Sequence, residues 1–255
     1  MKYAKLPVVL LSSFASMKRD STNGAIVDFI LKNINEDLTV KMVAEGAHVG
    51  NASVSRFIKD LGLSGFSELR ELILYSDCQF IFVDSSNVEN EVFESCTHAL
   101  EIAKNSVDVQ RIDVLCDAIK QAKEIAIFGL GKAECAAICL QMDLFSLGKN
   151  AYSSIQYSEQ IEYIKQAEKD CLIILFSATS SYFEYYDIRQ WKDKIQRSNV
   201  WYIGSGAVPD FIPHSVSYRF SDEDVSHPMQ LMYVAQCISQ RYANRRDDSK
   251  SMSLS

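Results

Sequence analysis

The sequence predicts two regions of different fold class, an all-α helical bundle followed by a doubly wound parallel-sheet α/β sandwich. In residues 1–76 the apolar residues recur at helical spacing, and glycines separate the helices. From residue 125 onward, continuous apolar runs at 125–128, 171–176 and 200–203 alternate with helical segments. Such runs are typical of parallel strands that are covered on both faces. With 255 residues and 47% hydrophobic content, the chain is long enough to bury one small and one medium core.

A helix, a short turn and a second helix are predicted between Thr39 and Gly62. Thr39 is a good N-cap for the first helix, and Gly46 can end it without a steric penalty at Cβ. The turn then spans residues 46–50, Asn51 caps the second helix, and Gly62 stops it. The residues predicted to face the core are Val40, Val43, Ala44 and Ala47 in the first helix and Val54, Phe57, Ile58 and Leu61 in the second.

The outer face of the second helix is small, polar and basic, which is the layout of a helix-turn-helix that reads DNA. Arg56 is either a phosphate contact or the partner of a nearby carboxylate, and its place on the outer face favours DNA. His48 in the turn is expected to be an ordinary surface residue. The predicted DNA-binding residues are Asn51, Ala52, Ser53, Ser55, Arg56 and Lys59.

Further helices are predicted on both sides of this pair. Residues 1–20 are interpreted as a lead-in with one helix, Asn23 caps a helix over residues 25–30, and residues 66–73 form a fourth. Residues 77–120 have long helical periodicity, which indicates a linker and a docking helix for the next domain. The predicted organisation is a helix-turn-helix DNA-binding domain at 1–76, a helical linker at 77–108, a sandwich domain at 109–246 and a disordered tail at 247–255.

Within the sandwich, helices are predicted to connect the strands. One helix over 133–147 follows the first strand, and another over 182–196 follows the second. A strand at 216–220 and an amphipathic helix at 229–241 complete the domain. Trp191 and Trp201 are interpreted as core or interface residues, and His227 as a surface residue.

Two loops follow apolar strands, where ligands bind in open α/β sheets because loop amides and helix N-termini attract anions. The glycines of the first loop either let the backbone approach a ligand or merely turn the chain, and the loop matches neither a dinucleotide fingerprint nor a Walker loop. The hydroxyls of the second loop either cradle a phosphate or cap the following helix. The predicted ligand-binding residues are Gly129, Gly131, Lys132, Ser177, Thr179, Ser180 and Ser181.

The charge is distributed unevenly between the two domains. Residues 1–76 carry nine Lys or Arg and eight Asp or Glu, whereas residues 77–255 carry 17 and 25. The net charge of −7 therefore belongs to the second domain. A module with a net charge of +1 binds DNA weakly alone, so a homodimer or a dimer of dimers, held mainly by the sandwich, is expected to place two modules on one double-stranded operator.

Composition also argues against several other classes of protein. The seven cysteines are scattered and include no CxxC, which favours reduced core thiols over a disulfide framework. The histidines and cysteines lack the spacing of a metal site, so no metal and no cofactor are expected. No apolar run approaches the roughly 20 residues of a membrane span, and the short run near the N-terminus does not make a signal peptide. The protein is therefore predicted to be cytoplasmic.

The helix-turn-helix region resembles the N-terminal domain of RpiR-type bacterial transcriptional regulators. The second half of the chain, from Glu124 to about Arg241, looks like a sugar isomerase (SIS) domain. The two resemblances together imply a regulator whose C-terminal domain binds an effector and dimerises. The first of them rests on the spacing of Ala44, Ala47, Val49, Ser53, Val54, Arg56, Phe57, Lys59, Leu61, Gly62, Gly65 and Phe66.

The loop pattern departs from the SIS domains that bind phosphosugars. The resemblance implies a serine, any residue, serine, glycine, any residue and threonine in the second loop, and a serine at position 133. This chain keeps Ser177 and has Thr179 for the second serine. It has Ser180 for the glycine, Tyr182 for the threonine and Ala133 for the serine. The phosphate loop is therefore degenerate.

Three functions follow from these observations. The leading hypothesis is a DNA-binding transcriptional regulator, not an enzyme, that senses a small anionic, phosphosugar-like metabolite. The alternative is a phosphosugar isomerase or related SIS enzyme with a helical extension. Such an enzyme needs a general acid and base, and no catalytic pair is nominated, although Glu159 is the acid nearest the second strand. The third is a regulator that has lost its ligand and uses the sandwich only to dimerise.

Overall fold

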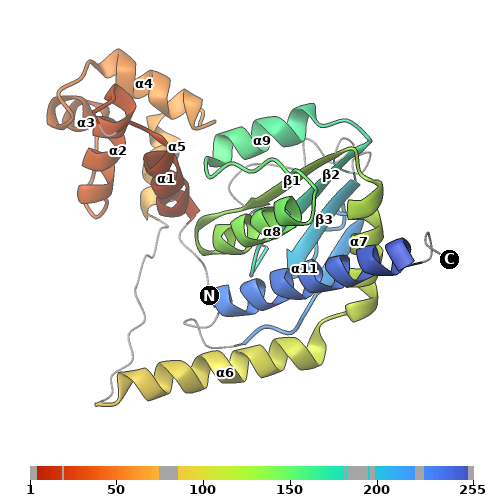
Figure 1. Cartoon of the computed structure of the whole chain (residues 1–255). Coiled ribbons are helices and arrows are strands. Elements are labelled where there is room, and N and C mark those ends of the chain that lie inside the picture. Colours follow the sequence, from red (N-terminus) through yellow and green to blue (C-terminus); the bar gives the residue numbers. More distant parts are fainter. Residues whose placement is uncertain are drawn as a thin grey trace. The chain divides into compact units, whose positions relative to one another are not determined.

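The structure is a computed structural model that describes residues 5–18, 20–74, 86–180, 182, 195, 199–221 and 227–251. The chain divides into two compact units (Figure 1). Unit 1 contains the five N-terminal helices together with residues 154–163. Unit 2 contains the sheet and the remaining helices, except for the helix that begins within residues 154–163. Within these ranges, no helix is long and apolar enough to cross a bilayer.

Unit 1 is the predicted all-α bundle. Its core is formed by one apolar stripe from each helix, including Leu10, Ile26, Val43, Phe57 and Leu69, all of which are buried. The short loops between these helices let consecutive helices pack against each other. The helices are α1 (Lys5–Ser16), α2 (Thr22–Lys32), α3 (Val40–Gly46), α4 (Asn51–Asp60) and α5 (Phe66–Leu74).

The start of α2 differs from the sequence prediction. Ser21, not Asn23, is the N-cap, because its hydroxyl accepts a hydrogen bond of 3.0 Å from Gly24 N. Serine and asparagine are about equally good caps, so the choice between two candidates two residues apart is made by packing. The helix therefore begins at Thr22 and brings Ile26 and Ile30 to the core.

Unit 2 is the predicted α/β sandwich. Its four described strands are parallel and lie in the order β1-β2-β3-β4. The last strand lies two residues before its predicted start, and the predicted helix at 182–196 falls almost wholly outside the described residues. The elements of unit 2 are α6 (Val88–Ser106), α7 (Val109–Gln121), β1 (Glu124–Gly129), η1 (Gly131–Ala133), α8 (Glu134–Ser146), β2 (Cys171–Phe176), β3 (Asn199–Gly204), β4 (His214–Ser217) and α11 (His227–Ser251). Between α8 and β2 lies α9 (Tyr157–Gln166), most of which belongs to unit 1.

Tyr152, which belongs to none of the four strands, pairs with the edge of β1 that faces away from β2 and makes the sheet doubly wound. Tyr152 forms a parallel bridge with Ala126, in which Ile127 N donates to Tyr152 O and Tyr152 N donates to Ile125 O, both at 2.8 Å. The chain thus passes from β1 to Tyr152 on one side and then to β2 on the other. The order of strands reverses at β1, so the carboxyl end of β1 is the topological switch point of the sheet.

Both faces of the sheet are buried, as the continuous apolar strands predict. On one face Ile127, Ile174 and Trp201 pack in a core formed with α7, α8 and α11. Phe128 and Tyr202 point to the opposite face and are also buried. In Figure 1, α8 and α11 lie side by side across the sheet.

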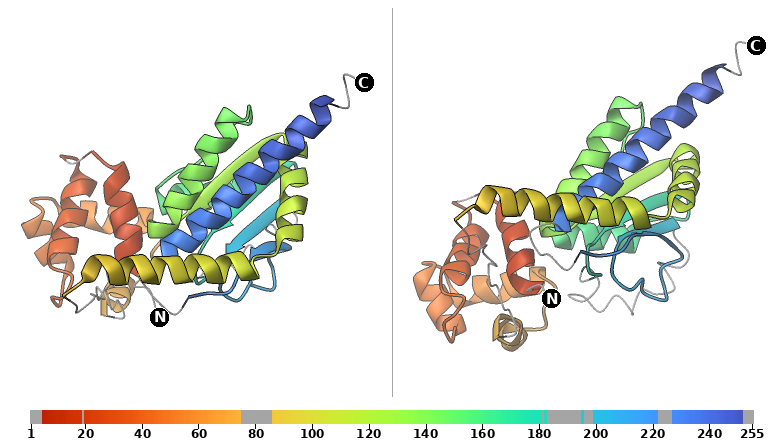
Figure 2. Two further views of the ribbon diagram at one scale, coloured as in Figure 1. Left: turned by 60° about the horizontal axis from the view of Figure 1, so that its bottom comes forward. Right: turned by 90° about the horizontal axis from the view of Figure 1, so that it is seen from below.

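The second unit extends beyond its predicted boundaries at both ends. Residues predicted as a linker form α6, which packs against α11 through the buried Ala99 and Ala103 (Figure 2). Gln230 Nε2 of α11 also donates to Ala99 O at 2.9 Å. At the other end α11 continues to Ser251, so residues 247–251 of the predicted tail are helical, and residues 252–255 lie outside the described chain.

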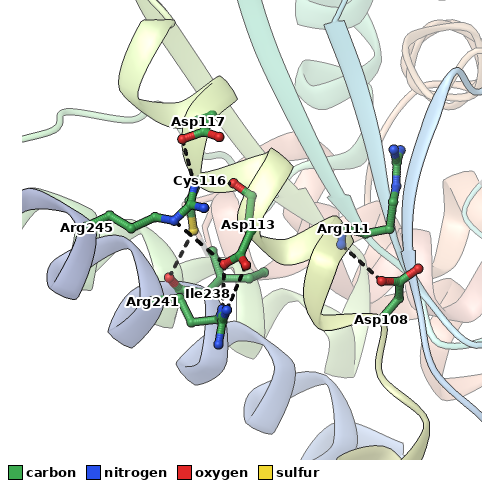
Figure 3. A network of polar contacts seen from close by, with 8 residues as sticks. All are labelled: Asp108, Arg111, Asp113, Cys116, Asp117, Ile238, Arg241 and Arg245. Carbon is green, nitrogen blue, oxygen red and sulfur yellow. Dashed lines mark hydrogen bonds and ion pairs between the residues drawn. The ribbon is translucent and has the colours of Figure 1, made fainter.

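A network of ion pairs holds α7 against α11 (Figure 3). Arg241 donates two hydrogen bonds of 2.7 Å to the carboxylate of Asp113, and Arg245 donates to Asp117 at 2.7 Å. The hydrogen bond from Arg241 holds the pKa of Asp113 below its ordinary value. Beside them, burial raises the pKa of the Cys116 thiol to about 12, so this cysteine is an unreactive core thiol.

The cysteines only partly fit the prediction of core thiols. Cys116 and Cys171 are buried, but Cys135 on α8 is exposed and Cys139, one turn later, is half-buried. All of the described cysteines are free thiols.

Candidate DNA-reading helix and strand-end loops

The turn between α3 and α4 packs α4 on the bundle and leaves one face of it exposed. Thr39 caps α3 as predicted, with Met42 N donating to Thr39 Oγ1 at 3.2 Å. Gly46 is the last residue of α3 but is not a left-handed cap. A Cβ at this position would lie 1.8 Å from the ring of Phe29, so the glycine permits close packing of α3 on α2. The left-handed residue of the turn is His48, with φ of 56°.

The second helix begins differently from the prediction. Gly50 is its N-cap and makes no side-chain hydrogen bond, while Asn51 is the first helical residue. The Asn51 side chain is exposed in the first turn of α4. Asn51 therefore does not cap the helix, and a base contact by Asn51 in the major groove stays a prediction.

The predicted outer face of α4 is solvent-exposed. Val54, Phe57 and Ile58 are buried against the bundle, and Leu61 and the left-handed Gly62, with φ of 83°, end the helix as predicted. Ser53 is half-buried. The exposed residues among those predicted to bind DNA are Asn51, Ala52, Ser55, Arg56 and Lys59.

The two cations of this face have no carboxylate partner within the described residues. Other cations of the bundle are paired, such as Arg70 with Asp37 at 2.6 Å and Lys32 with Asp28 at 2.6 Å. Arg56 and Lys59 form no such ion pair within the described part of the bundle. The alternative that Arg56 serves a neighbouring carboxylate is therefore not supported, and its charge is available for a phosphate.

The two predicted loops of the sandwich meet at the carboxyl edge of the sheet. Gly129 ends β1 and is in register with Phe176, which ends β2, so the loops start side by side at the switch point. Open α/β sheets bind their ligands at this place. The structure thus brings the first loop and the described part of the second together, while Ser181 lies outside the described residues.

Both glycines of the first loop are favoured by the local backbone geometry. A Cβ on Gly129 would lie 2.6 Å from Ala133 O and 2.8 Å from Glu134 N, so only glycine lets α8 start so close to β1. Gly131 has a φ of 61°, which favours glycine. Lys132, directly after Gly131, is exposed and forms no ion pair with any described carboxylate.

The hydroxyls of the second loop make hydrogen bonds within the protein. Ser177 is buried, and its Oγ accepts from Tyr182 N at 3.4 Å, as the capping alternative predicts. Ser180 Oγ lies 2.6 Å from Ala207 O and 3.0 Å from the Tyr202 hydroxyl. Thr179 is half-buried.

Ser180 adopts a left-handed backbone conformation, with φ of 62°. This is the position at which the resemblance to phosphosugar-binding domains implies a glycine. The loop therefore keeps the backbone turn that glycine would provide and adds a side chain that crosses to the next loop.

A third loop at the same edge is missing from the sequence prediction. Gly204 ends β3, and a Cβ on it would lie 1.9 Å from Ser177 O. A Cβ on Gly206 would lie 2.5 Å from Ser180 Oγ. The Tyr202 hydroxyl donates to Ser177 O at 2.7 Å. The signal is a Gly-Ser-Gly directly after an apolar strand, the same place in the sequence at which the other two loops were identified.

Glu134 is a further residue at this edge of the sheet that the sequence prediction does not include. It is the first residue of α8, directly after the first loop, and its Oε1 is buried without a hydrogen-bond donor among the described residues. Burial raises the pKa of this carboxyl from 4.5 to about 7. Near neutral pH the carboxyl is therefore partly protonated and partly charged. It lies at the start of α8, where an anion would approach the helix.

The comparisons with known proteins agree with this architecture. Residues 14–77 match the helix-turn-helix domain of the rpiR family. The chain is 24% identical over 176 residues to the HTH-type transcriptional regulator HexR of Pseudomonas aeruginosa, covering 64% of this chain and 61% of that protein. It spans 55 to 61% of the length of the curated relatives that it matches.

Two solved structures share the fold. The Vibrio vulnificus NanR protein complexed with ManNAc-6P matches with a TM-score of 0.55 at 14% identity, covering 96% of this chain and 94% of that chain. The sugar isomerase domain of an RpiR transcription factor from Sphaerobacter thermophilus matches with a TM-score of 0.53 at 18% identity, covering 64% of this chain and 93% of that chain. Unit 1 is thus a helix-turn-helix domain of the rpiR family. Unit 2 has the fold of a sugar isomerase domain.

Proposed function

We propose that this protein is a cytoplasmic transcriptional regulator that binds an operator through α4. The observation that supports it most directly is the exposed face of α4, where Arg56 and Lys59 form no ion pair within the described residues. Asn51, Ala52 and Ser55 lie at the N-terminal end of the same face. These residues suit base contacts, and the two cations suit phosphates.

We also propose that the regulator acts as a homodimer or a dimer of dimers held mainly by unit 2. The N-terminal module has nearly balanced charge, so one copy alone holds DNA weakly at physiological salt. Two modules at fixed spacing add their contacts and match the symmetry of a palindromic operator.

The proposed effector is a small anionic, phosphosugar-like metabolite bound at the switch point between the loops after β1 and β2. The start of α8 at the carboxyl edge of the sheet and the exposed Lys132 support an anion. NanR, which shares the fold, was solved with ManNAc-6P. The ligand is expected to contact backbone amides of the two loops and Lys132, and Thr179 stays a predicted contact. Ser177 and Ser180 make hydrogen bonds within the protein.

We propose that unit 2 binds this metabolite without turning it over. The curated relatives are transcriptional regulators, although the solved structures that share the fold include a putative sugar-phosphate isomerase from Listeria monocytogenes. A phosphosugar isomerase would interconvert an aldose phosphate and a ketose phosphate. Incubation of the protein with a panel of sugar phosphates, followed by product analysis, is expected to show no interconversion.

The DNA-binding proposal is tested with a duplex selected from a random library by the wild-type protein. Arg56→Ala is expected to weaken binding to this duplex. If Arg56 contacts phosphate, the loss is similar on all sequences and the dependence on salt becomes shallower. If it reads guanine, discrimination of roughly 1–3 kcal/mol is lost at one base pair. Ser55→Glu places a negative charge against the backbone and is expected to abolish binding.

The matched control is Lys32→Ala, which removes a paired lysine from α2 of the same unit. It should bind the selected duplex like the wild type. Fluorescence anisotropy at two salt concentrations measures all three variants. Unchanged binding by both Arg56→Ala and Ser55→Glu would refute α4 as the reading helix.

A further inference from the structure

Tyr202 is a buried polar residue near the carboxyl edge of the sheet, and its side chain bonds to the second ligand loop. It belongs to β3 and has no exposed surface. Its hydroxyl donates a hydrogen bond of 2.7 Å to Ser177 O, at the start of that loop. A buried hydroxyl is costly unless it is hydrogen-bonded, so the position of this tyrosine depends on the loop that it contacts.

The Tyr202 hydroxyl also accepts hydrogen bonds from two loops. Burial raises the pKa of this hydroxyl, while hydrogen bonds from the Ser180 hydroxyl and from the backbone amides of Gly206 and Ser180 act in the opposite direction. The hydroxyl therefore stays protonated at neutral pH and can donate and accept at the same time. One side chain thus connects the start of the second loop, its turn at Ser180 and the third loop, which we define as residues 204–207.

The side chain of Ser180 makes a further connection between these loops. Ser180 Oγ donates to Ala207 O at 2.6 Å. A Cβ on Gly206 would lie 2.5 Å from Ser180 Oγ, so the glycine leaves the room that this side chain occupies. The φ of 62° at Ser180 is strained for a residue other than glycine, and such a conformation persists only where its surroundings fix it.

The backbones of the two loops continue the pairing of β2 with β3 beyond the ends of these strands. Ser177 N donates to Ile203 O at 3.0 Å, and Ser205 N donates to Ala178 O at 3.3 Å. A Cβ on Gly204 would lie 1.9 Å from Ser177 O, so only glycine permits this approach. The second loop is therefore attached to the third by backbone and side-chain contacts that are all made within the protein.

We propose that Tyr202 and Ser180 are positioning residues for the effector, because through these contacts they hold the second loop in the conformation that binds the anion. A glycine at position 180 would leave the turn free to rearrange, whereas Ser180 is fixed by its side chain. A loop that already has its bound conformation loses less entropy on binding, which raises affinity. This inference rests on the proposed effector site and names residues that shape it.

The first test follows the loops themselves and uses no ligand. Tyr202→Phe removes the hydroxyl but keeps the buried ring, and Ser180→Gly removes the side chain but keeps the left-handed turn. Hydrogen exchange of the full chain is expected to become about tenfold faster in peptides that cover 177–180 and 204–207, and to stay unchanged in β1. Tyr242→Phe, at a buried tyrosine of α11, is the matched control and should exchange like the wild type.

The second test measures the binding of two probes by calorimetry. The probes are inorganic phosphate and ManNAc-6P, with which NanR was solved. For a probe that binds the wild type, Tyr202→Phe and Ser180→Gly are each expected to raise the dissociation constant about fivefold, because the binding conformation is less populated. Both changes open the same connection, so the double variant should lose little more than either single variant. Tyr242→Phe should bind like the wild type.

The same variants separate positioning from a merely structural role. A residue that only stabilises unit 2 lowers the midpoint of urea unfolding but leaves the affinity of the folded protein unchanged. Calorimetry is therefore done at a temperature at which every variant is folded, as shown by circular dichroism. A loss of affinity under these conditions, without additivity in the double variant, is the signature of a shared effect on the loop.

The outcomes distinguish the loop contacts from the effector site. Unchanged exchange in both variants, or unchanged affinity for a probe that binds the wild type, overturns the positioning role while the effector site stands. A wild type that binds neither probe at millimolar concentration overturns the effector site and the positioning role together. Faster exchange confined to the two loops, together with the non-additive loss of affinity, supports the proposal.

Discussion

At the scale of single residues, Glu134 connects the stability of unit 2 to the ligand loops. Its carboxyl is partly buried at the start of α8, next to Gly129, whose backbone approaches Glu134 N. Because burial disfavours the charged form, the carboxyl takes up a proton near neutral pH. The same charge opposes a bound anion, so an anionic ligand and a protonated Glu134 are expected to favour each other.

Glu134→Gln is expected to change how the free energy of unfolding depends on pH. The pKa of Glu134 is higher in the folded state, so its favourable contribution is complete below pH 4.5 and is lost as the pH rises through about 7. At pH 8 the variant should be more stable than the wild type by about 1 kcal/mol, a figure reduced for solvent screening because the residue is half-exposed. Urea unfolding at several pH values, followed by tryptophan fluorescence, measures this.

Glu124→Gln is the control for Glu134→Gln, because it removes the same charge from an exposed position at the start of β1. Both tryptophans, at positions 191 and 201, lie in the C-terminal part of the chain, so the signal reports on that part. An equal gain of stability at pH 8 in both variants would assign the effect to net charge and contradict the role of burial.

Some residue-level predictions were limited by choices that a sequence does not reveal. Thr39 and Gly62 act as predicted, but the cap of α4 is Gly50 and not its neighbour Asn51. Gly46 has the right residue type for a helix end, yet it is required by the ring of Phe29, which is distant in sequence. Local patterns identify helix ends, whereas contacts between helices decide which residue forms them.

At the scale of elements, the ion pairs between α7 and α11 are expected to stabilise unit 2. Asp113→Asn removes the carboxylate that accepts two hydrogen bonds from Arg241 and should cost about 1 kcal/mol at pH 7. The pKa of Asp113 is lowered in the folded state, so the contribution is present at neutral pH and is lost as the pH falls below about 4. Urea unfolding at pH 7 and pH 3 measures both.

The control for this prediction is Asp170→Asn, at a surface ion pair in which Lys123 lies 2.8 Å from Asp170. This exposed pair is expected to contribute nothing measurable. Equal destabilisation by Asp113→Asn and Asp170→Asn, or the same loss at pH 3 as at pH 7, would show that the bidentate geometry of Arg241 has no special effect.

Most of the helices and strands could be predicted from the sequence, because apolar residues are spaced differently in helices and in buried strands. Continuous apolar runs gave β1, β2 and β3, and helical spacing gave α4 and α8. The bridge at Tyr152 could not be predicted, since one paired residue leaves no apolar run. Residues of α6 were predicted as a linker because only two small residues, Ala99 and Ala103, are buried along its length.

At the scale of the whole molecule, the proposed function requires that ligand binding at the loops of unit 2 alter operator affinity. An effector does this only through its different affinity for two arrangements of the dimer. This requirement does not depend on a contact between the two units of one chain.

Such coupling requires a ligand of unit 2. Calorimetry with a panel of sugar phosphates and amino-sugar phosphates is expected to identify a ligand, and at 100 times its dissociation constant it should stabilise the protein by about 2.7 kcal/mol. Lys132→Ala and Thr179→Val should weaken binding, by about 0.5–1.5 kcal/mol for a neutral hydrogen bond and more for the lysine. Lys120→Ala, an exposed lysine of α7, is the control.

The same ligand should change operator affinity about 5- to 150-fold, which corresponds to a coupling of roughly 1–3 kcal/mol, and the operator must change ligand affinity by the same factor. Anisotropy with and without ligand and calorimetry with and without operator measure the two directions independently. Tight binding that is insensitive to Lys132→Ala and Thr179→Val would refute the site. Binding at this site with no effect on the operator would leave unit 2 as a dimerisation domain, because a ligand with equal affinity for both arrangements shifts neither.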